Sequence, residues 1–163
     1  MVNCEYSQVR FQDLEPSELF VANISQANHI LMKTILDRNG QKTYGAAILS
    51  PTDSEYEGYP GTIDPMMLEV VLKLPSHKYH IEFEPLHSSE PRVGMNPNPG
   101  ALYLCGNTTY TAIYDNRSAA YVNLQTGEIG SPNNPRHVFV NSWEIVRYIE
   151  GTRHQLLSQN ASR

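Results

Sequence analysis

The sequence predicts a single α+β domain over residues 1–163, mainly antiparallel sheet with flanking helices. Two observations predict the sheet. Apolar and polar side chains alternate in short segments such as residues 79–84, and turn dipeptides such as Asp115-Asn116 separate such segments. A third observation predicts the helices, because two segments begin with a helix-capping residue and continue with apolar residues three or four apart.

Residues 16–37 have two interpretations. Their apolar side chains recur at spacings of three to five, which suits one helix or two short ones that end at Asn39-Gly40. Alternatively, HILMKTILD and KTYGAAILS are two strands of a hairpin around Asn39-Gly40, a common hairpin dipeptide. The pattern does not decide between them, although the hairpin explains the Asn-Gly dipeptide better.

The middle of the chain combines loops with one helix and one strand. Residues 50–65 are rich in Pro, Gly, Asp and Ser, which predicts a long loop. Asp64 as N-cap and Pro65 at the first helical position then predict a helix that ends near Leu74. Residues 79–84 alternate as a half-buried strand does.

The C-terminal part predicts strands over residues 102–104, 110–114, 119–124 and 137–140. Asn141 followed three residues later by Glu144 predicts a capped helix, with Trp143 on its core side and Gly151 as its stop. A short helix is expected over residues 154–157, and a disordered tail over about 158–163.

Composition limits the function. The net charge of −5 argues against binding to nucleic acid, because such proteins concentrate Lys and Arg. Cys4 and Cys105 form no metal or redox motif, so we expect reduced thiols. No signal peptide or membrane-spanning run is evident, which predicts a cytoplasmic protein without a membrane partner. The sequence leaves the oligomeric state open.

Acidic and tyrosine side chains in the irregular connections predict a partner-binding surface. Tyrosine offers apolar area with a hydrogen-bonding tip and is enriched at interfaces, and loops often carry binding residues. The predicted contact residues are Glu55, Tyr56, Glu57, Tyr59 and Glu90.

An alternative is a small metal-dependent enzyme that uses His80, Glu82, Glu84 and His87. Imidazoles and carboxylates that project from one strand face suit a divalent metal or acid–base chemistry. The plainer interpretation is a solvent-facing strand surface. No established catalytic motif is present, so the sequence predicts no catalytic residue and no cofactor, and it favours a binding protein over an enzyme.

The order of the C-terminal segments resembles the SUKH superfamily of bacterial immunity proteins. The segments that carry the resemblance are ALYLCG at 101–106, AAYVNLQTGEIG at 119–130 and VFVNSWEIVRYI at 138–149. The resemblance implies an α+β sheet closed by a helix, and a non-enzymatic protein that binds and neutralises a toxin. An acidic surface would suit a basic toxin domain. An effector or adaptor that binds other proteins is a further alternative.

Overall fold

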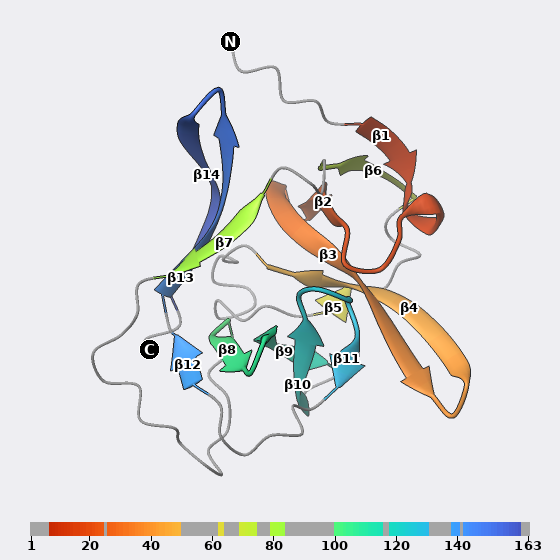
Figure 1. Cartoon of the computed structure of the whole chain (residues 1–163). Helices are drawn as coiled ribbons and strands as arrows, with labels where there is room; N and C mark the ends of the chain where they lie inside the picture. Colours follow the sequence, from red (N-terminus) through yellow and green to blue (C-terminus); the bar gives the residue numbers. More distant parts are fainter. Residues whose placement is uncertain are drawn as a thin grey trace.

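The computed structural model shows three antiparallel β-sheets (Figure 1). It describes residues 7–24, 26–49, 62–63, 69–74, 79–83, 100–115, 118–130, 138–140 and 142–160. Among these residues, helix is limited to the short 3₁₀ turn η1 at Phe11–Asp13. The predicted α+β class with flanking helices is therefore wrong, because the segments expected to form helices form strands.

The strands fall into three sheets of six, five and three members. The first sheet consists, in spatial order, of β1 (Ser7–Arg10), β6 (Val70–Lys73), β2 (Leu19–Ile24), β3 (Ala27–Arg38), β4 (Gln41–Ile48) and β5 (Thr62–Ile63). The second consists of β11 (Ile129–Gly130), β10 (Ser118–Asn123), β9 (Thr108–Asp115), β8 (Leu102–Cys105) and β12 (Val138–Val140). The third consists of β14 (Thr152–Asn160), β13 (Ser142–Ile149) and β7 (His80–Phe83).

The hairpin interpretation of Asn39-Gly40 is confirmed. Strands β3 and β4 pair from Leu31↔Ile48 to Arg38↔Gln41, and Asn39-Gly40 is the two-residue loop between them. Both loop residues have positive φ, 55° and 85°, as a type I′ turn requires. The competing helix over residues 16–37 is wrong, since β2 and β3 occupy that segment.

The predicted helix after Pro65 is also wrong where the structure describes it. Val70–Lys73 is strand β6, which pairs with both β1 and β2. Residues 64–68, with the expected N-cap Asp64, lie outside the described residues. Val70 and Val71 are β-branched, and the sheet neighbours on both sides supply the hydrogen bonds that favour a strand.

The predicted capped helix from Asn141 to Gly151 is the strand β13, and β14 replaces the short helix expected at residues 154–157. The two strands form a hairpin whose loop, Glu150-Gly151, has positive φ at both positions. Gly151 therefore closes a hairpin turn rather than a helix. Strand β14 continues to Asn160, and residues 161–163 lie outside the described residues.

The main core lies where the three sheets meet. Trp143 of β13 is fully buried there, as expected for a core residue, and its indole N–H donates to the carbonyl of Gly100 at 2.7 Å. That hydrogen bond satisfies the one polar atom of a large apolar side chain. The buried residues of this core are Leu19, Met32, Ala47, Leu49, Leu74, Leu102, Ile113, Val122, Leu124, Val140, Trp143, Ile145 and Leu157.

A second core covers the other face of the first sheet, beneath η1. Phe11 packs edge-on against Phe20, with ring centroids 5.7 Å apart. Lys33 of β3 is also buried here, at 4% exposure, and its ammonium donates to the backbone carbonyls of Phe11 and Leu14 at 3.2 and 2.5 Å. Burial lowers the pKa of Lys33, while the nearby carboxylates of Glu15, Glu18 and Asp13 oppose that shift.

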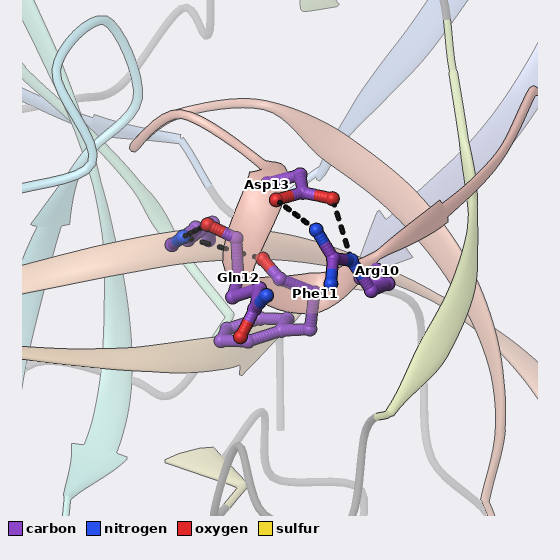
Figure 2. A network of polar contacts seen from close by, with 5 residues as sticks. Arg10, Phe11, Gln12 and Asp13 are labelled. Atoms are coloured by element: carbon purple, nitrogen blue, oxygen red, sulfur yellow. Dashed lines mark hydrogen bonds and ion pairs between the residues drawn. The ribbon is translucent and has the colours of Figure 1, made fainter.

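The η1 turn carries an exposed ion pair on its outer side. The Arg10 guanidinium donates to the Asp13 carboxylate three residues along the chain (Figure 2), and the distance from Nε to Oδ2 is 2.9 Å. Because both side chains are exposed, this pair adds little stability. The buried Lys33 ammonium is therefore the stronger anchor of the turn.

Gly127 joins the second sheet to the first. Its carbonyl accepts from the backbone N–H of Ile35 at 2.9 Å, beside a parallel bridge between Ile35 and Glu128. A Cβ atom at Gly127 would lie 2.5 Å from Ser17 N and 2.7 Å from Lys33 O, and its φ is +74°. Only glycine permits this approach of two backbones. The turn between β10 and β11 is therefore also a contact between sheets.

In the part of the chain that the structure describes, no helix is both long and apolar enough to cross a membrane.

Candidate functional site

The structure does not describe the residues predicted to contact a partner. Glu55, Tyr56, Glu57, Tyr59 and Glu90 all lie outside the described residues. The same is true of Glu84 and His87 from the alternative metal cluster. His80 and Glu82 are described, and both lie on β7.

His80 and Glu82 belong to one face of the three-stranded sheet. Glu82 lies directly opposite Glu144 of β13, and His80 lies opposite Val146. Tyr148 follows on the same face of β13 because side chains alternate along a strand. On the other side of β13, Arg153 of β14 lies opposite Tyr148. We call His80, Glu82, Glu144, Tyr148 and Arg153 the polar face.

The opposed pair Glu82 and Glu144 would repel, because like charges directly across two strands are destabilising. Arg153 removes this conflict. Its Nε donates to Glu82 Oε2 at 3.1 Å, and its terminal NH2 group donates to Glu144 Oε2. One guanidinium thus bridges carboxylates from two strands and ties all three strands together.

The second oxygen of Glu82 is also occupied. The Tyr148 hydroxyl donates to Glu82 Oε1 at 2.6 Å. The Tyr148 ring lies beside His80, with ring centroids 6.1 Å apart and planes tilted by 57°. Both oxygens of the Glu82 carboxylate therefore have a protein donor.

The long side chains of Tyr148 and Arg153 extend along the sheet. Each starts near the β13–β14 turn, and each reaches a carboxylate of the facing pair Glu82 and Glu144. Val146 lies between these positions on the same face of β13 and is 0% exposed.

These hydrogen bonds shift the ionisation of the polar face. The hydrogen bond from Tyr148 lowers the pKa of Glu82, with a further contribution from Arg153. The same hydrogen bond raises the pKa of Tyr148, because the phenol proton is shared with a carboxylate. The hydrogen bond to Glu144 raises the pKa of Arg153. Both shifts of the ion pair therefore favour a charged Glu82 carboxylate beside a charged Arg153 guanidinium.

This arrangement suits recognition better than metal binding. Glu82 directs both oxygens at Tyr148 and Arg153, and a divalent cation would have to displace the guanidinium. Within the described ranges, no group of three or more His, Cys, Asp or Glu side chains is placed to hold a metal ion. Cys105 is free, and Cys4 lies outside the described residues.

Sequence reasoning missed Glu144, Tyr148 and Arg153 as neighbours of Glu82, because it placed Glu144 and Tyr148 on a helix. A period-two interpretation of residues 142–149 would have placed Glu144 and Tyr148 on one strand face. Trp143 and Ile145 then face the core while Glu144 and Tyr148 share the opposite face, as the burial pattern shows.

Comparisons with protein-family models, curated proteins and solved structures found no match to this chain.

Proposed function

We propose that the chain is a protein-binding module that engages a basic partner through the polar face. The observation that carries the proposal is the state of Tyr148, which is 47% exposed yet held by a hydrogen bond to Glu82. Tyrosine and arginine side chains dominate the binding energy of many interfaces. A side chain that is already ordered loses less conformational entropy on binding.

The charge of the surface favours a basic partner. The polar face has one more carboxylate than guanidinium, and the chain as a whole carries a net charge of −5. Such a field attracts a basic protein and accelerates the encounter at low salt. A basic toxin domain, the partner class implied by the sequence resemblance, would be one protein of this kind.

The fold that the resemblance implies, a sheet closed by a helix, is not the fold of this chain. The segment VFVNSWEIVRYI, expected to form a strand and then the closing helix, contains strand β12 and strand β13. The proposal therefore rests on the surface and its charge.

The test is affinity capture followed by a measured affinity. The immobilised chain is exposed to a lysate of the source organism, and the captured proteins are identified and purified. We expect a basic protein that binds the wild type and the Lys42→Ala control on exposed β4, with affinity reduced about thirtyfold or more by Tyr148→Ala. Absence of a captured protein, or equal affinity of Tyr148→Ala and the control, would overturn the proposal.

Salt provides a second test. Binding of a basic partner should weaken as ionic strength rises, mainly through a slower association rate. A captured protein whose association rate does not depend on salt would contradict the predicted charge complementarity.

A further inference from the structure

A separate groove lies on the first sheet and shares no residue with the polar face. It has a volume of about 340 Å³ and crosses four neighbouring strands, β1, β6, β2 and β3. Its lining residues are Gln8, Val21, Ala22, Asn23, Asn28, Val70, Val71 and Leu72. This volume is at the small end of the range for ligand-binding clefts, so it accepts a short segment.

The middle of the groove is apolar and open to solvent. Val70 and Leu72 are 51% and 42% exposed, and they lie two residues apart on the same face of β6. Leu72 lies opposite Val21 on one side and Gln8 on the other, so these three side chains share one face. Val71 points the other way, into the second core, and anchors the strand beneath.

One end of the groove carries a pair of amide side chains. Asn23 and Asn28 lie directly opposite each other on β2 and β3, and Asn23 Nδ2 donates to Asn28 Oδ1 at 3.2 Å. This single bond uses one donor and one acceptor of the pair. Because each amide has two N–H donors and two oxygen lone pairs, Asn23 Oδ1 can still accept and Asn28 Nδ2 can still donate a hydrogen bond. Together they match the N–H and C=O of one peptide group.

None of the described residues that line the groove has an ionisable side chain. In a chain of net charge −5, a neutral apolar surface beside paired amides favours an uncharged occupant. A charged ligand would lose its hydration in this groove without gaining an opposite charge.

We propose that this groove binds an extended, uncharged segment of a partner protein. An apolar side chain of that segment would pack on Val21, Val70 and Leu72, and a neighbouring peptide group would bond to Asn23 and Asn28. This site is independent of the proposed function, since the two surfaces share no residue and are tested by different variants.

The test uses a displayed library of random short peptides. The library is depleted on the Leu72→Lys variant and then selected on the wild-type chain. We expect enriched peptides with apolar residues and no net charge, whose affinity falls at least about tenfold in Leu72→Lys. Asn23→Ala should weaken binding about fivefold, the equivalent of one hydrogen bond.

Two controls make the result decisive. Thr43→Lys places the same charge on an exposed position of β4, outside the groove, and should leave affinity unchanged. Val70→Lys is a second groove variant at a more exposed position, for use if Leu72→Lys does not fold by circular dichroism. No enrichment, enrichment of charged peptides, or equal binding by the groove variants and Thr43→Lys would overturn the proposal.

Discussion

Two hairpins in this molecule have the same kind of two-residue turn but differ in how the faces of their strands are covered. Asn39-Gly40 joins β3 to β4, Glu150-Gly151 joins β13 to β14, and all four residues have positive φ. In β3, four consecutive side chains at 31–34 are buried, so both of its faces are covered. In β13, Trp143 and Ile145 are buried on one face while Glu144 and Tyr148 reach solvent on the other.

The difference indicates which strand can be used for binding. The core-covered part of β3 has no free surface, and its Lys33 ammonium bonds to backbone carbonyls inside the fold. The polar face of β13 is ordered by hydrogen bonds and yet open. Substitutions should therefore affect stability most in the first hairpin and recognition most in the second.

The largest effect on stability is expected from Lys33→Met. Methionine fills a similar volume but removes the hydrogen bonds to the carbonyls of Phe11 and Leu14. Since an unsatisfied buried group costs about 1–3 kcal/mol, the loss should be about 2–4 kcal/mol of unfolding free energy. Urea unfolding measures it. Lys42→Met, on an exposed β4 position, is the control, and equal stability of the two variants would contradict the anchoring role.

A smaller and equal effect is expected at the two turns. In Gly40→Ala and Gly151→Ala the added Cβ atom would meet no other atom within 4 Å, so only the positive φ opposes the new side chain. Each should lose about 1 kcal/mol by thermal or urea unfolding. Gly130→Ala, which is also unobstructed but does not have positive φ, should be near neutral. Unequal losses at Gly40 and Gly151 would show that the turns differ.

The smallest effect on stability, but a clear effect on ionisation, is expected from Tyr148→Phe. Removing the phenol hydroxyl should raise the pKa of Glu82 towards its ordinary value. NMR titration of the Glu82 carboxyl carbon measures this shift. The control Tyr44→Phe, outside the polar face, should leave the Glu82 titration unchanged. An unaltered Glu82 pKa in Tyr148→Phe would disprove the hydrogen bond.

The direction of the pH dependence follows from the same contacts. The folded chain lowers the pKa of Glu82, so its stabilising contribution is complete above the unfolded pKa, near 4.3, and is lost as pH falls through the folded value. The folded chain raises the pKa of Tyr148. That contribution is complete below the unfolded pKa, near 10, and is lost as pH rises through the folded value.

The first hairpin could be predicted from the sequence and the second could not. Asn at position 39 tolerates positive φ, so Asn39-Gly40 is a strong local signal for a hairpin. Glu150-Gly151 is not, because Gly after an apolar segment also ends helices. Asn141 and Glu144 imitate a capping box, although Ile145, Val146 and Ile149 are β-branched residues that favour strands.

The polar face could be predicted only in part. Alternation placed His80 and Glu82 on one face of β7, which the register confirms. Arg153 comes from a strand 71 residues from Glu82, and that pairing follows from tertiary contacts that local periodicity does not contain.

The most direct test of the central claim is the footprint of the captured partner on the labelled chain, measured by NMR titration. If the polar face is the recognition surface, amide shifts should concentrate on residues 80–83, 144–148 and 153–158, and Tyr148→Ala should remove them. Saturable shifts elsewhere, with the amides of β7, β13 and β14 unmoved, would contradict the claim.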